Sequence, residues 1–276
     1  MSTRYSPSEG VSIYEDDAAA FDFGPEQTLA TTQARTGYRI AKRTLDIVVS
    51  LSTLVILSPL ILTIWIYVRW HSTGPVIFRQ IRIKKNRRTL HNRIPHANPE
   101  KTNSKGITKY NSERRKFDYY GQPFLFYKFA TMYPDSRQRF PELYAYDYSL
   151  TDIQTLHFKI KNDPRIPPWA GWLRRSSLDE LPNFINVLRG DMTLIGPRPD
   201  IPEMTKYYTA EQQRIKLSVK PGITGFAQIR GRGDLSFQQT LEYDLEYVKN
   251  ASFFLDIKIL ILTFLKLFQG RNGGAF

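Results

Sequence analysis

Two adjacent carboxylates, Asp179 and Glu180, are the residues whose types and surroundings best suit chemistry. They lie in the stretch 174–199, RRSSLDELPNFINVLRGDMTLIGPRP, which places arginines on both sides of the acids. A carboxylate can act as a nucleophile or transfer a proton, and nearby arginines favour an anionic substrate. If this protein is an enzyme, we expect its reaction to occur in this stretch.

The same residues also fit a purely structural interpretation, a capped amphipathic helix. Ser177 and Glu180 match a capping box, whereas Asp179 as the N-cap would place the following proline in the first turn. In both alternatives the acids lie at the positive end of the helix dipole. Helical spacing puts Asp179, Asn183 and Asn186 on one face and the apolar residues opposite. For these residues alone, the capped helix is the commoner explanation.

Composition limits the classes of partner and of site. The chain has 276 residues, 41% of them hydrophobic, and a formal net charge of +13. Such a charge favours anionic partners: nucleic acid, an acidic bilayer surface or phosphorylated substrates. The absence of cysteine excludes disulfides, thiolate catalysis and cysteine-based zinc sites, and the four histidines are not spaced as metal ligands.

An uncharged segment at 47–68 is long enough to cross a bilayer. Ser58 and Pro59 interrupt its middle, where a proline breaks or kinks a helix. Basic residues flank both ends, whereas a crossing helix normally has its basic excess on one side. From the residues alone, a re-entrant helix over 41–72 and a kinked spanning helix both remain open.

The remaining segments predict a mixed fold. Residues 1–40 are polar and predict a mobile tail, and 74–83 alternates as a strand does. Residues 121–136 predict a strand or a strand pair, and 236–250 an amphipathic helix. The apolar helix expected at 253–268 is too short to span a bilayer, so it should lie at the membrane interface or be buried.

Residues 84–116 form a basic insert with eleven Lys or Arg against two acids. Such a run is most often a solvated loop. The alternative is contact with anionic lipid or another polyanion. No recognition helix or RNA-binding motif accompanies it, which argues against nucleic acid.

Seven stretches, in this order, resemble the bacterial sugar transferases that start polysaccharide and glycoconjugate assembly, the monotopic polyprenyl-phosphate phosphoglycosyl transferases. They are KRTLDIVVS…LSPLIL, GPVIFRQIRI, GQPFLFYKFATM, NDPRI, LRRSSLDELPNFINVLRGDMTLIGPRP, KPGITGFAQIRGRG and LEYDLEYVKNASFFLDIKIL. They cover about 40–270 apart from the basic insert. No single motif decides, but the ordered set is specific.

The resemblance implies transfer of a phosphosugar from a nucleotide diphosphosugar, usually a UDP-sugar, to undecaprenyl phosphate. UMP leaves, Mg²⁺ is required, and the sugar phosphate is carried covalently on the first acid of the pair. Asp179 is then the nucleophile and the Mg²⁺ contact, and Glu180 the neighbouring acid or base. Arg174 and Arg198 match arginines that would bind the diphosphate, and Lys128 is a secondary candidate.

The resemblance also implies an architecture. Gln228 and Arg232 are further candidates for the substrate pocket, and Ser58-Pro59 matches the break of a re-entrant membrane helix. The expected fold is α+β, largely helical and monotopic, with a short β element and amphipathic interface helices. The chain would then consist, in order, of a tail (1–40), the re-entrant helix (41–72) and a cytoplasmic catalytic domain (73–270).

The implied location is the cytoplasmic face of the bacterial inner membrane, in contact with anionic lipid. Nucleic acid is not an expected partner, and a homo-oligomer stays open. Residues 1–40 hold no four-helix membrane bundle, so we expect a compact member of the family.

The chain departs from the family pattern at several positions. Ala130 stands where the family usually has Arg, Pro167-Pro168 replaces a Thr-containing turn, and Arg230 stands where Asn is common. Two other functions therefore stay in view. One is a polyprenyl-phosphate glycosyltransferase that releases UDP, and the other is a non-catalytic, basic membrane scaffold.

Overall fold

The computed structural model describes residues 36–85, 121–157, 160, 162–231 and 233–268. Most of the tail expected at 1–40 and most of the basic insert expected at 84–116 lie outside these ranges. Within them the chain is mostly helical, with two small two-stranded sheets. The α+β, largely helical class expected from the sequence is therefore confirmed.

A pair of helices comes first, α3 (Thr36–Ile56) and α4 (Ser58–His71), bent by 64° at the break between them. Pro59 lies in the first turn of α4, and the Ser58 hydroxyl donates to the Val55 carbonyl at 2.8 Å. The predicted break at Ser58-Pro59 is thus observed. Among the described residues no single helix is long and apolar enough to cross a membrane, and only this bent pair reaches that length and composition together.

The first sheet pairs β1 (Ile77–Lys84) with β2 (Gln122–Phe129), antiparallel, from Ile77 opposite Phe129 to Lys84 opposite Gln122. The strand expected at 74–83 is confirmed, and 121–136 contributes one strand rather than two. In β2 the side chains of Phe124, Phe126 and Phe129 are buried in the core.

Short helices and turns join this sheet to a second one. They are α5 (Ser136–Arg139), η1 (Pro141–Tyr144), α6 (Leu150–Thr155), η2 (Pro168–Ala170), α7 (Gly171–Arg175), η3 (Leu178–Glu180) and α8 (Asn183–Arg189). The second sheet pairs β3 (Thr193–Ile195) with β4 (Gly222–Thr224) in parallel, and η4 (Pro202–Tyr207) and α9 (Ala210–Lys216) lie between them in the chain. The last helices are α10 (Phe226–Gly231), α11 (Phe237–Asn250) and α12 (Phe253–Phe268).

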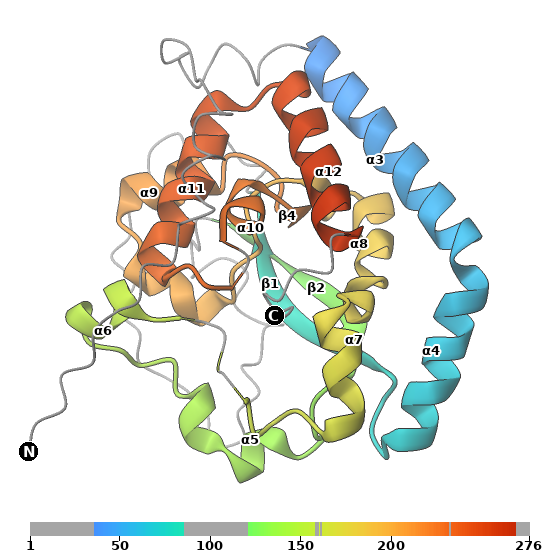
Figure 1. The fold of residues 1–276 in the computed structure, drawn as a ribbon. Coiled ribbons are helices and arrows are strands. Elements are labelled where there is room, and N and C mark those ends of the chain that lie inside the picture. Colours follow the sequence, from blue (N-terminus) through green and yellow to red (C-terminus); the bar gives the residue numbers. More distant parts are fainter. Residues whose placement is uncertain (1–35, 86–120, 158–159, 161, 232, 269–276) are drawn as a thin grey trace, which may run out of the picture.

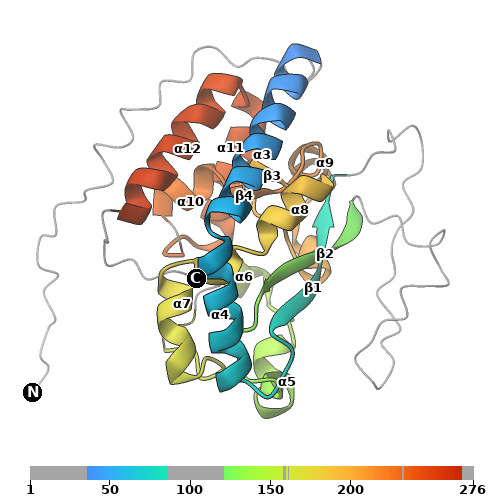
Figure 2. The same ribbon diagram turned by 90° about the vertical axis from the view of Figure 1, so that its right-hand side faces the viewer.

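The bent helix pair lies along one side of the body formed by the other elements (Figures 1 and 2). α12 runs beside α3, and α7 lies beside α4, in both views. Apolar contacts explain the second pairing, because Ile64 and Val68 of α4 pack with Leu173 of α7 and Phe129 of β2.

Polar side chains attach α3 to the body. Lys42 Nζ lies 2.6 Å from Asp256 Oδ2 of α12 and donates to the Ile195 carbonyl at 2.9 Å. Arg43 donates to the Val187 and Leu188 carbonyls, which are among the last of α8. In the sequence Lys42 and Arg43 are the basic flank before the apolar segment, and in the structure their charged ends bond within the protein.

Candidate active site

Asp179 and Glu180 lie in the 3-10 turn η3, between the end of α7 and the start of α8. Neither expected cap is formed. Ser177 has a left-handed backbone (φ 57°) and no side-chain capping bond, and Pro182, not Asp179, is the residue before α8. The prediction of a longer capped helix is therefore wrong, and the two acids lie buried in a tight turn between two helices.

The polar face of α8 is the buried one. Asn183 and Asn186 are 0% exposed, whereas Ile185 on the opposite side is 44% exposed. The Asn186 amide donates to the Leu125 carbonyl at 2.7 Å and accepts from the Tyr127 N–H at 3.2 Å. It thus bonds to β2 as another strand would, and it fixes the acid-bearing turn beside the strand that carries Lys128.

Asp179 is 2% exposed, and its Oδ1 has no hydrogen-bond partner among the described residues. Burial raises the pKa of its carboxyl to about 6, against the attraction of Lys128, and the Glu180 charge raises it further. Arg174 and Arg198 act in the opposite direction. A buried carboxylate oxygen without a partner costs free energy, and here it lies in the field of three cations, which together indicate a functional role for Asp179.

Glu180 has a different environment although it is the next residue. Its Oε1 accepts from Arg198 Nη2 at 3.0 Å. Arg198 comes from the Gly-Pro-Arg-Pro turn that follows β3, so this ion pair joins the acid turn to the second sheet.

Two more cations complete the surroundings of the acids. Burial lowers the pKa of Lys128 on β2 to about 8, and repulsion from Arg174 adds to this effect. Burial also lowers the pKa of Arg174 on α7, whose Nη1 donates to Thr131 Oγ1 at 3.4 Å. Both cations are attracted to Asp179 and Glu180. Like-charged side chains held together in this way form a site for an anion with several negative oxygens.

The structure therefore brings together five of the residues that the sequence nominated, Asp179, Glu180, Arg174, Arg198 and Lys128. For Gln228 the structure shows a buried amide with no hydrogen-bond partner among the described residues. Arg232 lies outside the described residues. Ala130, at the position of the family's Arg, packs among the apolar residues around α4.

Arg82 is a residue of the site that sequence reasoning missed, since it looked like one of several basic residues after the apolar segment. Its Nη1 donates to the Pro199 carbonyl at 2.7 Å, next to Arg198. In the sequence, Arg82 was marked only by its place in the GPVIFRQIRI stretch, and the resemblance of that stretch to the family implied no role for this residue.

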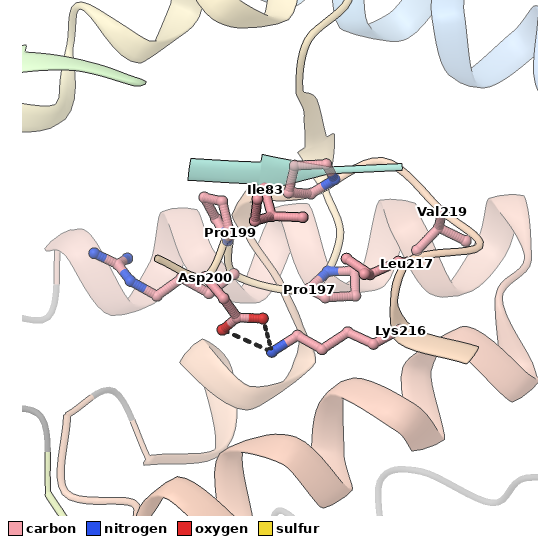
Figure 3. A pocket seen from close by; sticks show the side chains of 9 residues that line it. Ile83, Pro197, Pro199, Asp200, Lys216, Leu217 and Val219 are labelled. Carbon is pink, nitrogen blue, oxygen red and sulfur yellow. Dashed lines mark hydrogen bonds and ion pairs between the residues drawn. The ribbon is translucent and has the colours of Figure 1, made fainter. Parts of the chain in front are cut away.

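A small hollow lies at the Arg198 turn, lined by Pro197, Arg198, Pro199 and Asp200 together with Lys216 (Figure 3). Lys216 Nζ bonds both Asp200 oxygens, at 2.9 and 3.0 Å, and the Tyr208 hydroxyl at 3.0 Å. Burial alone would lower the Lys216 pKa, but its anionic neighbours, chiefly Asp200, raise it well above the ordinary value. This buried lysine anchors the residue that ends the turn.

The donor set near the acids limits how a metal could bind. Among the described residues, no group of three or more His, Cys, Asp or Glu lies together. Mg²⁺, however, commonly takes only one or two carboxylates from a protein and fills its shell with substrate phosphates and water. The buried Asp179 carboxylate, with one oxygen that has no hydrogen-bond partner among the described residues, fits such a single-carboxylate contact.

This chain is similar to known proteins over most of its length. The family model described as "Bacterial sugar transferase" matches residues 37–93 and 97–270 of this chain. The chain belongs to the bacterial sugar transferase family. The matched residues include the acid turn and the three cations around it, Lys128, Arg174 and Arg198.

Individual bacterial sugar transferases are similar to this chain. An undecaprenyl-phosphate galactose phosphotransferase of Salmonella typhimurium is 34% identical over 267 residues, 96% of this chain and 48% of that protein. A UDP-glucose:undecaprenyl-phosphate glucose-1-phosphate transferase of Escherichia coli is 34% identical over 240 residues, 84% of this chain and 41% of that protein.

The exopolysaccharide production protein ExoY of Rhizobium meliloti is 30% identical over 241 residues, 87% of this chain and 90% of that protein. The chain thus spans about half the length of the Salmonella transferase and nearly all of the Rhizobium protein.

Proposed function

We propose that the protein transfers a sugar phosphate from a nucleotide diphosphosugar, a UDP-sugar, to undecaprenyl phosphate and releases UMP. This would be the first membrane step in making a polysaccharide or glycoconjugate. The main structural support for this proposal is the buried Asp179 oxygen, which has no hydrogen-bond partner among the described residues and lies in the field of Lys128, Arg174 and Arg198. The names of the Salmonella and Escherichia relatives, both undecaprenyl-phosphate sugar phosphotransferases, support the same reaction class.

In the first step, Asp179 Oδ1 attacks the phosphorus that carries the sugar. The bond from this phosphorus to the bridging oxygen breaks, UMP leaves, and an acyl phosphosugar remains on Asp179. In the second step, a phosphate oxygen of the lipid attacks the same phosphorus and frees the carboxylate. An acyl phosphate is reactive enough to be discharged by a second acceptor, so two easier steps replace one difficult step.

Charge decides whether an anionic nucleophile can approach a diphosphate. Arg174, Arg198 and Lys128 supply fixed positive charge where the negative charge of the transition state develops. We assign Glu180 to proton transfer beside the reacting phosphorus, held in place by Arg198. Mg²⁺, which Asp179 would contact, would supply further positive charge to the phosphate oxygens when bound.

We further propose that α3 and α4 form a re-entrant anchor in the cytoplasmic face of the inner membrane, beside anionic lipid. Large apolar side chains on the outer surfaces of these helices are exposed, among them Val55 (64%) and Ile56 (73%) at the break. α12 adds exposed Phe254 and Phe264 beside α3, as expected of an interface helix. A lipid-borne phosphate and a soluble nucleotide sugar could then meet at the plane of the headgroups.

The test is nucleotide release by the purified full-length chain in lipid nanodiscs with undecaprenyl phosphate, Mg²⁺ and a panel of UDP-sugars. We expect UMP with at least one sugar, a radiolabelled phosphosugar adduct when the lipid is omitted, and loss of both in Asp179→Asn. Glu180→Gln should slow turnover by about 100-fold or more, as removal of a general acid or base does. Asp147→Asn, which changes an exposed carboxylate, is the control and should keep full activity.

Other products would identify the alternatives. Release of UDP would indicate a glycosyltransferase that transfers the sugar without its phosphate. No product and no adduct across the panel would favour a scaffold, and full turnover in Asp179→Asn would contradict the covalent mechanism.

A further inference from the structure

Strand β1 reaches the active site through Arg82. The Arg82 Nη1 donates to the Pro199 carbonyl at 2.7 Å, and the backbone N–H of Ile83 donates to the Asp200 carbonyl at 2.9 Å. Two consecutive residues of β1 thus hold the two residues that follow Arg198. The peptide that carries Arg198 is attached to the first sheet as well as to β3.

The Arg82 side chain is itself held in one geometry. Its Nε donates to Gln80 Oε1 at 2.9 Å, and its guanidinium lies 5.3 Å from the ring centroid of the buried Phe126. A planar guanidinium fixed by two hydrogen bonds and a ring contact loses little further freedom when it binds an anion. Arg82 is therefore pre-organised.

The electrostatic surroundings of Arg82 indicate an anionic ligand. Burial lowers its pKa to about 10, and repulsion from Arg198 lowers it further. Attraction to Asp200 and Glu180 opposes this only in part. Two guanidiniums kept close together repel each other, and a phosphate group between or beside them would relieve the repulsion.

We propose that Arg82 is a positioning residue for the donor diphosphate: it fixes the Arg198 turn through the Pro199 carbonyl and adds a cation to the field there. This inference rests on the proposed function. Because the contact is to the turn and not to the acids, it acts on binding of the nucleotide diphosphosugar through Arg198. Its removal affects the KM for that donor more than the chemical step.

Three single variants test the assignment. Arg82→Met keeps an unbranched side chain but removes the guanidinium over Phe126, with its charge and its hydrogen bonds, and Arg82→Lys keeps the charge. Arg79→Met is the matched control, because Arg79 is exposed on the same strand. Loss of a charge-assisted hydrogen bond is worth about 10- to 100-fold, so we expect Arg82→Met to raise the donor KM by that factor. Arg82→Lys should show a smaller rise, with little change in kcat, and Arg79→Met none.

A double-mutant cycle separates positioning from a general loss of structure. In an Arg198→Met background the further effect of Arg82→Met on the donor KM should be less than about threefold, because the group through which it acts is gone. Equal effects in both backgrounds, or an unchanged KM in Arg82→Met, would overturn the proposal. Calorimetric binding of UDP-sugar to the same proteins, made inactive by Asp179→Asn, gives a readout that does not need turnover.

Different results would contradict the proposed function and the proposed role of Arg82. If the wild-type protein neither binds UDP-sugar nor releases UMP, the proposed function is wrong. If the wild type does both, and Arg82→Met binds the donor equally well, only the role of Arg82 is wrong. Should Arg82→Met not fold, Arg82→Lys and calorimetry decide. Unaltered donor affinity in Arg82→Lys together with unaltered coupling to Arg198 would contradict positioning by the guanidinium.

Discussion

Asp179 and Glu180 are neighbours in the chain, but they acquire different chemistry from what surrounds them. Asp179 Oδ1 is buried without a hydrogen-bond partner in the described part of the chain, whereas Glu180 is paired with Arg198. Two carboxylates in unequal environments can take separate roles, one as nucleophile and one in proton transfer. Both acids could be predicted as site residues from the sequence, because their motif is local. Their difference depends on residues from β2, α7 and the Arg198 turn, which come together only in the fold.

A second buried carboxylate makes folding stability depend on pH. Lys216 Nζ faces Asp200 and also lies 3.0 Å from Asp244 Oδ2, so one ammonium is shared by two carboxylates. Burial raises the pKa of Asp244 to about 6, in spite of Lys216. Between about pH 4 and pH 6 the folded protein therefore binds this proton and the unfolded chain does not. This contribution to stability is present at low pH and is lost as the pH rises through that interval.

Asp244→Asn cannot bind this proton, so it should flatten the pH dependence of the free energy of unfolding. The change between about pH 4 and pH 7 should be at most about 3 kcal/mol, since one pKa unit is worth about 1.4 kcal/mol. Denaturant unfolding of the detergent-solubilised protein at several pH values measures it. Glu242→Gln, an exposed change on the same helix, is the control. A pH profile of Asp244→Asn that runs parallel to that of the wild type would contradict the prediction.

At the level of elements, the same local signal gives different outcomes at two positions. Ser236 and Gln239 form a reciprocal capping box at the start of α11, where a helix was expected. Ser177 and Glu180 have the same spacing, but Ser177 is left-handed and caps nothing. α11 continues for 14 residues without a proline, whereas Pro182 interrupts the other candidate. The strands and long helices could be predicted from periodicity, and the short turns that hold the site could not.

Helix α3 contributes to the site through one carboxylate. Asp46 is 2% exposed, and its Oδ1 accepts from Thr193 Oγ1 at 2.8 Å and from the Leu194 N–H at 2.9 Å. These residues form β3, which leads directly into the Arg198 turn. From the sequence, this segment was predicted only as a membrane helix. The contact of Asp46 with β3 could not be predicted, because nothing local relates Asp46 to a strand almost 150 residues away.

Asp46→Ala should lower the free energy of unfolding by about 1–3 kcal/mol, because it leaves the Leu194 N–H without its acceptor. It should also slow UMP release. Asp46→Asn keeps an amide oxygen in the same place and should restore most of both properties. Ser50→Ala is the matched control: Ser50 is buried on the same helix, and its hydroxyl has no partner among the described residues. If Asp46→Ala and Ser50→Ala lose equal stability and activity, the hydrogen bonds from Asp46 of α3 to β3 do not account for the loss.

For the whole molecule, the decisive feature is that both ends of the bent helix pair pack on the same body. Asp46 and Ser50 of α3 are buried, as are Ile64 and Val68 of α4, whereas Val55, Ile56 and Leu62 near the break are exposed. If the body that both helices contact lies outside the bilayer, both ends of the pair lie on its side of the membrane. This arrangement favours a re-entrant anchor, whose break enters the bilayer, over a kinked span that would separate the two ends. The sequence alone left these alternatives open because the flanking contacts were not visible in it.

Because the natural chain has no cysteine, single cysteines can report the side of the membrane on which each end lies. Arg39→Cys and Arg69→Cys place a thiol at exposed positions before and after the apolar segment, and Ile56→Cys places one at the break. A re-entrant anchor predicts that both arginine positions react with a membrane-impermeant maleimide in inverted inner-membrane vesicles and not in intact spheroplasts. Ile56→Cys should be protected in both. A spanning helix instead predicts that one of the two arginine positions reacts from outside. Labelling of Arg39→Cys or Arg69→Cys in intact spheroplasts would therefore show that the helix pair crosses the membrane. A known cytoplasmic thiol, which should stay unlabelled, is the control for intact spheroplasts.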